Sequence, residues 1–180
     1  MPTPFSLRQL LAAAALALPA LGHAAYPERP IEWVVPYAAG GGSDVVARVV
    51  AEPMAKALGQ SIIILNKPGA ATNIGADYAA RAKPDGYTLL TGDTGTLAAN
   101  AYLYQKLSYS AEKDFAPVAL LTRFPNIMVV NNTVPAKTVT EFISYAKANP
   151  RGIFFASSGA GSSTRLSAEL FKTMAGVEME

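Results

Sequence analysis

Three segments of this chain place glycine beside serine, threonine or aspartate, directly after an apolar run and before a helical pattern. They are Tyr37 to Asp44, Gly92 to Thr96 and Ser157 to Thr164, and Lys67 to Gly75 is a close fourth. A helix start offers unpaired amides and a partial positive charge, which attract an anion. Glycine lets a ligand approach the backbone, and Ser or Thr adds a hydroxyl. Several such loops facing one cleft would hold a carboxylate without any Arg or Lys.

Two alternatives compete with this interpretation. Tight turns between strands and helices also require glycine, so one loop alone leaves both explanations open, whereas four loops favour a ligand site. Nucleotide motifs fit less well. The start Gly42-Ser43-Asp44 lacks the lysine of a P-loop, and Gly159 to Thr164 supplies only the first two glycines of a dinucleotide fingerprint. We therefore expect no cofactor. Asp44 could contact a ligand or cap its helix, and the cap is favoured.

Histidine and cysteine set the limits on chemistry. His23 is the only histidine, it falls in the expected signal peptide, and the chain has no cysteine. A Ser-His-Asp triad, a histidine metal site and a thiolate site are therefore excluded from residues 25–180. Without Arg8, 14 basic residues face 13 acidic ones, with no basic run. Nucleic acid is an unexpected partner for such a chain.

The first 25 residues predict an export signal. Arg8 supplies positive charge, Leu10 to Leu21 is an apolar run of twelve residues, and Gly22-His23-Ala24 precedes a cleavage site. A helix of that length reaches roughly 18 Å, short of a bilayer core of about 30 Å. An uncleaved anchor is the alternative, and Pro19 argues against it. The mature chain is expected to begin at Ala25, in the periplasm.

The rest of the chain alternates strand and helix signals, which predicts an α/β fold with a mostly parallel sheet. One face of the first helical pattern is expected to be apolar, and Pro53 is expected to kink this helix. The residues of that face are Val45, Val46, Val49, Val50, Met54, Ala57 and Leu58. A strand signal begins at Val177 and is not completed, so we expect a fragment. The expected strands are 31–35, 62–65, 87–91, 117–121, 127–130 and 153–156, and the expected helices are 43–58, 74–82, 96–104, 138–149 and 164–175.

Several motifs, in order from Tyr26 to Glu180, resemble the receptors of tripartite tricarboxylate transporters, also called Bug proteins. The resemblance rests on Tyr26-Pro27-Glu28-Arg29-Pro30-Ile31, Val35-Pro36-Tyr37-Ala38-Ala39-Gly40-Gly41-Gly42-Ser43-Asp44, Asn66-Lys67-Pro68-Gly69-Ala70, Asn73-Ile74-Gly75-Ala76, Lys83-Pro84-Asp85-Gly86-Tyr87-Thr88-Leu89-Leu90, Asp114-Phe115-Ala116-Pro117-Val118 and Val134-Pro135-Ala136-Lys137-Thr138.

This resemblance implies a periplasmic-binding-protein-like fold of type II, in which two α/β lobes close on a ligand. Residues 1–25 would be the signal peptide, 26–125 the first lobe and 126–180 the start of an incomplete second lobe. Arg165 stands where many members have histidine, and Pro53 is unusual in the first helix. Together with the loop chemistry, the resemblance predicts ligand contacts from Tyr37, Ala39, Gly40, Gly41, Gly42, Ser43, Asp44, Asn73, Gly75, Thr94, Ser157, Ser158 and Ser162.

The function that the resemblance implies is capture of a small carboxylate, such as a di- or tricarboxylate, an acidic amino acid or an aromatic acid. A monomeric receptor would deliver this ligand to the permease subunits of a transporter in the membrane. Two alternatives stay open. The chain could be an exported hydrolase with Ser158 as nucleophile, or a sensor that presents its ligand to a membrane kinase.

Overall fold

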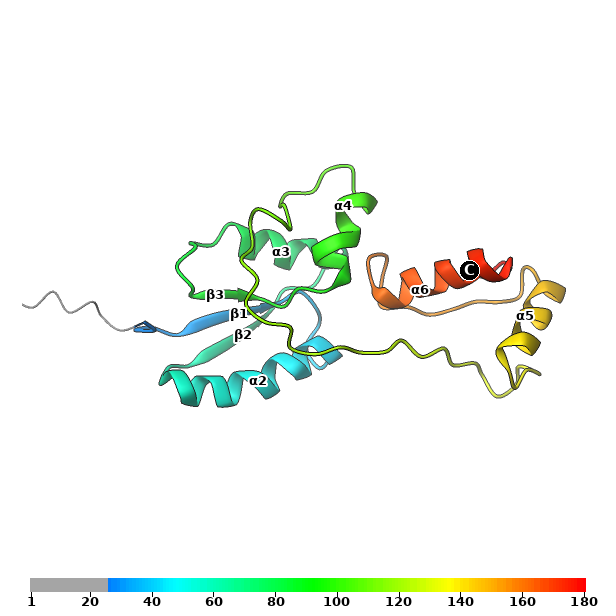
Figure 1. Cartoon of the computed structure of the whole chain (residues 1–180), viewed down its shortest axis with the longest axis horizontal. Helices are drawn as coiled ribbons and strands as arrows, with labels where there is room; N and C mark the ends of the chain where they lie inside the picture. Colours follow the sequence, from blue (N-terminus) through cyan, green and yellow to red (C-terminus); the bar gives the residue numbers. More distant parts are fainter. Residues whose placement is uncertain (1–25) are drawn as a thin grey trace, which may run out of the picture.

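The computed structural model describes residues 26–180, so the expected signal peptide and its cleavage site lie outside the described residues. The chain forms two packed units joined by an extended segment (Figure 1). In chain order the elements are β1 (Ile31–Val35), α2 (Gly42–Leu58), β2 (Ile62–Asn66), the 3-10 turn η1 (Ala70–Thr72), α3 (Asn73–Ala80), β3 (Thr88–Leu90), the π turn η2 (Gly95–Ala99), α4 (Asn100–Leu103), α5 (Val139–Ala148) and α6 (Ser163–Ala175).

The first unit is a parallel sheet between helices, as the alternating pattern predicts. Its strands follow the order β2-β1-β3. Val34 of β1 lies opposite Leu65 of β2 and Leu90 of β3. In Figure 1, α2 lies on one side of the sheet and α3 on the other. Because all three strands run in the same direction, the loops that follow them emerge at one edge of the sheet.

The core of the first unit forms where α2 meets the sheet. Trp33, Val35, Ala47 and Ala51 are buried there in one cluster. The expected apolar face of α2 is therefore wrong in part, since Val45 and Val49 are 51% and 67% exposed. The small alanines let the helix approach the bulky Trp33 closely, and that contact decides which face turns inward. The helix is continuous across Pro53.

The segment between the two units does not form the strands expected at 117–121 and 127–130. Val118, Leu120 and Val129 are largely exposed instead. A strand is stable only beside another strand that pairs with its backbone, and no described residue offers that pairing. One anchor is present: the amide of Asn126 donates to the Ser163 carbonyl at 3.1 Å and to the Ser167 hydroxyl at 2.8 Å.

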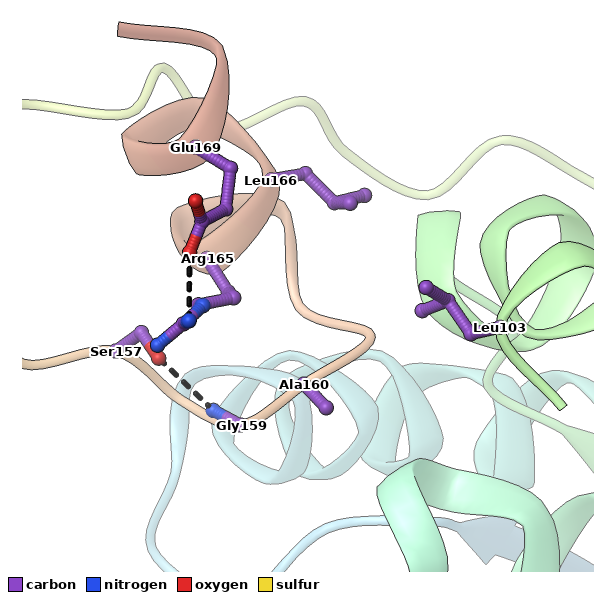
Figure 2. A pocket seen from close by; sticks show the side chains of 7 residues that line it. All are labelled: Leu103, Ser157, Gly159, Ala160, Arg165, Leu166 and Glu169. Carbon is purple, nitrogen blue, oxygen red and sulfur yellow. Dashed lines mark hydrogen bonds and ion pairs between the residues drawn. The ribbon is translucent and has the colours of Figure 1, made fainter. Parts of the chain in front are cut away.

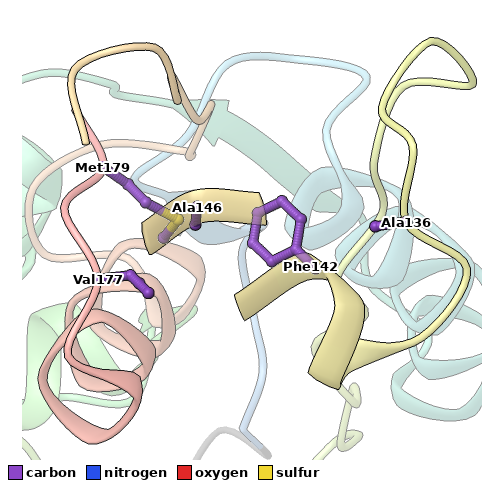
Figure 3. Close-up of a cluster of buried hydrophobic side chains, with 5 residues drawn as sticks. All are labelled: Ala136, Phe142, Ala146, Val177 and Met179. Atoms are coloured by element: carbon purple, nitrogen blue, oxygen red, sulfur yellow. The ribbon is translucent and has the colours of Figure 1, made fainter. Parts of the chain in front are cut away.

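The second unit packs α5 and α6 around a small core of its own. Ala136, Phe142, Ala146, Val177 and Met179 are buried together (Figure 3). A capping box stands at the start of α5, because the Thr138 and Glu141 side chains exchange hydrogen bonds with each other's backbone.

The expected strand at 153–156 is not assigned as a strand. Its backbone is nevertheless partly paired, because the Phe155 amide donates to the Glu180 carbonyl at 2.8 Å and the Glu180 amide donates to the Ile153 carbonyl at 2.9 Å. These two bonds have the alternating pattern of a parallel ladder. The parallel sheet expected in the second lobe is thus represented, within residues 26–180, by this single pairing.

Candidate functional site

The loops after β1, β2 and β3 are tied together at the edge of the sheet by a chain of polar side chains. The Tyr37 hydroxyl donates to Oδ2 of Asp93, which joins the first loop to the third. Oδ1 of Asp93 accepts hydrogen bonds from the Thr96 amide at 2.9 Å and the Thr96 hydroxyl at 3.0 Å. The Thr96 and Thr72 hydroxyls are 2.8 Å apart, which adds the second loop. The three loops are therefore joined by one hydrogen-bond network.

Tyr37 is a neutral hydrogen-bond donor in this network. Burial and the adjacent Asp93 carboxylate raise the pKa of Tyr37 far above its ordinary value. The contacts of Asp93 with Tyr37 and Thr96 are a feature that sequence reasoning missed.

A buried asparagine at the start of α4 holds the second loop. Nδ2 of Asn100 donates to the Ala71 carbonyl and to Oδ1 of Asn73, both at 2.7 Å. That loop is strained, because Ala70, Ala71 and Thr72 all have positive φ angles of 46°, 50° and 78°. Asn100 was not among the predicted site residues. Its signal in the sequence is a polar residue inside an otherwise apolar helical pattern.

The Asp44 side chain holds the first glycine loop in place. Its side chain is buried, and Oδ2 accepts hydrogen bonds from the Gly40 amide at 2.8 Å and from Nε of Arg48 at 2.9 Å. Oδ1 accepts a third from Nδ2 of Asn66 at 2.9 Å. These donors, Arg48 foremost, hold the pKa of Asp44 well below its ordinary value. Both carboxylate oxygens are engaged by the protein. The N-cap position of α2 belongs to Gly41, so Asp44 organises the loop without being a conventional cap.

The amides of the first loop divide into two groups. Those of Gly40 and Gly41 donate within the protein, to Asp44 Oδ2 and to the Ala38 carbonyl at 3.3 Å. Gly42 and Ser43 begin α2, where the first amides have no acceptor inside the helix. A carboxylate at this point would meet these amides and the positive end of a helix of 17 residues. The candidate amide donors in this loop are therefore those of Gly42 and Ser43, together with Ala39, which is an exposed neighbour.

The start of α3 faces the same edge and is built for close packing. Gly75 is buried, and a Cβ atom there would lie 2.8 Å from Cβ of Pro36 and 2.9 Å from the Lys67 carbonyl oxygen. Glycine thus lets α3 approach the loop after β1. Oδ1 of Asn73 accepts from Asn100, and the Asn73 backbone amide donates to the Ala70 carbonyl. Of the predicted residues, this leaves the Gly75 amide as the donor in the first turn of α3 that can face a ligand.

The predicted residues of the second unit have mixed roles. Ser162 is buried and caps α6: its hydroxyl accepts from the Arg165 amide at 3.2 Å and donates to the Gly159 carbonyl at 2.7 Å. Ser157 and Ser158 are exposed, as is Thr94 in the first unit. The amide of Ser158 donates to the Thr164 hydroxyl at 3.1 Å, which leaves the Ser158 hydroxyl without a bond to residues 26–180.

A cavity of about 530 Å³ separates this serine loop from α4 (Figure 2). Arg165 pairs with Glu169 at 2.5 Å along one wall, and Leu103 stands opposite. Of the predicted residues, only Ser157 lines this cavity. The structure therefore places the serine loop beside a hollow between the units, and the other predicted contacts at the edge of the sheet.

A change in pH should test the role of Asp44. Because its pKa is lowered on folding, its ionised form stabilises the protein above the pKa of the unfolded state, about 3.9. This stabilisation should disappear as pH falls below about 4 toward the folded-state pKa. We expect Asp44→Asn to lower the free energy of unfolding at pH 7 and to reduce its loss between pH 5 and pH 2, measured by urea denaturation.

The matched control for this measurement is Asp85→Asn. Asp85 forms an ion pair with Arg29 at 3.0 Å, but both side chains are well exposed, so this pair should contribute little. An unchanged pH profile in the Asp44→Asn protein would contradict the positioning role.

Comparison with known proteins supports the resemblance noted in the sequence. Residues 46–180 match the profile of the tripartite tricarboxylate transporter family receptor, TctC. A Rhodopseudomonas palustris protein solved with adipate is 41% identical, with a TM-score of 0.82, over 86% of this chain and 52% of its own. MatC from the same species, solved with malate, is 39% identical, with a TM-score of 0.78, over 86% of this chain and 53% of its own. BugT of Bordetella pertussis is 36% identical over 84% of this chain and 47% of its own length.

The fold and these relatives define an α/β protein of the periplasmic-binding-protein class. The chain belongs to the tripartite tricarboxylate transporter receptor family, the Bug family. It spans about half the length of the relatives that it matches. In the part of the chain that the structure describes, no helix has both the length and the apolarity to cross a membrane. Residues 26–180 also contain no group of three or more metal-ligating side chains.

Proposed function

We propose that this chain carries the carboxylate-capturing half of a periplasmic receptor for a tripartite tricarboxylate-type transporter. The observation that carries the proposal is the joining of three loops at one edge of a parallel sheet, where the starts of α2 and α3 present main-chain amides. Two relatives in this family were solved with adipate and malate, both dicarboxylates. The ligand would be a di- or tricarboxylate, an acidic amino acid or an aromatic acid.

Within this proposal the predicted residues take two roles. The positioning residues are those whose polar groups bond within the protein: Tyr37, Gly40, Gly41, Asp44, Asn73 and Ser162. The contacts to the ligand come from the remaining residues: Ala39, Gly42, Ser43, Gly75, Thr94, Ser157 and Ser158.

The wider setting follows from the family. Its receptors and periplasmic relatives imply a periplasmic location. Cleavage of the signal peptide near Ala24, delivery to permease subunits and a monomeric state are part of the proposal. The division into lobes at residue 125 also stays a proposal, since that residue lies within the extended connecting segment.

The rival hydrolase mechanism gains no support from the geometry. A serine nucleophile needs an adjacent base within hydrogen-bond reach. The Ser158 hydroxyl has no such partner among residues 26–180, and the family whose profile matches the chain is described as a receptor family. We therefore assign the serine loop to binding.

Calorimetric titration of the purified protein tests the proposed function. Adipate, malate, citrate, glutamate and benzoate serve as candidate ligands, with the neutral diamide of adipate as the matched control. We expect saturable heat from at least one acid and none from the diamide, because only a carboxylate gains from amide donors and a helix start. Equal binding of adipate and its diamide, or a response only to uncharged ligands, would overturn the proposal.

A further inference from the structure

The two packed units touch through two buried glycines. Gly95 opens η2 in the first unit, and Gly161 is one of two buried positions in an otherwise exposed serine loop. A Cβ atom on Gly95 would lie 2.7 Å from the Gly161 carbonyl oxygen. A Cβ atom on Gly161 would lie 2.5 Å from Oδ1 of Asn100 and 3.6 Å from Cα of Gly95. Neither residue has the positive φ that would itself require glycine. The contact between the units is what requires it.

Asn100, directly beneath this contact, has an unpaired oxygen. The side chain is fully buried, and its Oδ1 has no hydrogen-bond partner among the described residues. Reversing the amide would not help, because Nδ2 already donates to the Ala71 carbonyl, which can only accept. Oδ1 therefore faces Gly161, whose carbon atoms cannot satisfy it in full. We call Gly95, Asn100 and Gly161 the glycine seam.

A buried acceptor without a donor opposes the arrangement that buries it. If the serine loop lifted away from the first unit, water would reach Oδ1 of Asn100 and this penalty would vanish. Holding Gly161 against Asn100 thus needs a compensating interaction. The same loop carries Ser157 and Ser158, whose side chains the proposed function places against the ligand. A ligand bridging the serine loop and the amides at the sheet edge would supply that interaction.

We propose that the glycine seam is the closing contact of the receptor, and that the unpaired Oδ1 of Asn100 keeps the empty protein from closing. This inference rests on the proposed function. It adds the residues at which the two units meet and the buried acceptor that opposes their contact. A ligand shifts the balance only by binding the closed form better than the open form.

The test uses two variants that obstruct the seam from opposite sides, Gly161→Ala and Gly95→Ala. Gly152→Ala is the matched control, because a Cβ atom there meets only Asn149, at an ordinary 3.8 Å. Small-angle scattering measures the radius of gyration with and without the best acid from calorimetry. We expect the wild-type protein and the control to contract on binding. Both seam variants should stay extended and bind at least tenfold more weakly.

Thermal unfolding of the empty proteins separates misfolding from failed closure, since the seam variants should melt near the wild-type temperature. If one variant does not fold, the other still obstructs the same contact. If the seam variants bind the acid and contract as the wild-type protein does, the glycine seam is not the closing contact. Absence of binding by the wild-type protein to every acid would instead overturn the proposed function, and the seam with it. Weakened binding with normal contraction would also contradict the seam.

Discussion

Asn100→Leu is expected to lower the free energy of unfolding by about 1–3 kcal/mol, because it takes the Asn100 donor away from the Ala71 carbonyl. Leucine has the same branched skeleton as asparagine but is larger, and it cannot donate to the Ala71 carbonyl or to Oδ1 of Asn73. Oδ1 of Asn73 retains the Tyr109 hydroxyl as a donor at 3.2 Å. Each buried acceptor left unpaired costs about 1–3 kcal/mol, and loss of the unpaired Oδ1 returns part of this.

The same change should weaken ligand binding, because the loop that Asn100 holds is strained. Three consecutive residues with positive φ persist only where surrounding contacts fix them. Urea denaturation and calorimetry with the best acid measure the two effects. Asn132→Leu, at an exposed position, is the control and should change stability by less than about 0.5 kcal/mol. An Asn100→Leu protein as stable as that control would show that the loop is held by other contacts.

Gly42→Pro is expected to raise the dissociation constant for the carboxylate by about ten- to a hundredfold without unfolding α2. A hydrogen bond to a charged group contributes about 1.5–3 kcal/mol, and 1.4 kcal/mol corresponds to a factor of ten. Proline removes one amide and is well tolerated at the first position of a helix, which Gly42 occupies. Gly41 already has the extended backbone, with ψ of 165°, that a residue before proline prefers.

The control for this change is Gly42→Ala, which retains the amide. A Cβ atom at residue 42 meets nothing within 4 Å, so alanine should leave both the fold and the affinity nearly unchanged. Circular dichroism verifies the helix in both proteins, and calorimetry gives the dissociation constants. Equal affinity of the proline and alanine variants would remove the Gly42 amide from the site.

The fold of the first unit could be predicted well because local signals and tertiary contacts agree there. The apolar run at 31–35 became β1, and Gly59 ends α2 in the left-handed conformation that favours glycine. The predictions for 117–121 and 127–130 failed for a physical reason. Apolar alternation indicates that a segment could form a strand, but strand formation depends on a partner elsewhere in the chain.

The site could be predicted to the level of loops but not of individual atoms. Glycine and serine spacing indicates where a helix start might meet an anion. It does not fix the contacts within a loop, from the Gly40 amide to Asp44 and from the Thr96 amide to Asp93, because these depend on the backbone path of each loop. Nor does it reveal that the Tyr37 hydroxyl donates to Asp93, because that contact joins residues from two different loops. Asn100 escaped notice for the same reason, since its partners lie more than twenty residues earlier in the chain.

The most direct test follows individual backbone amides by two-dimensional ¹H–¹⁵N NMR while the best acid is added to the labelled protein. If main-chain groups at the start of α2 hold the negative charge, the Gly42 and Ser43 signals should move downfield and saturate together with the calorimetric isotherm. The Gly40 amide, already bonded to Asp44, should move less. Saturable binding that leaves the signals of Gly42 and Ser43 in place, and shifts only residues around Leu103 and Arg165, would contradict capture by the helix start.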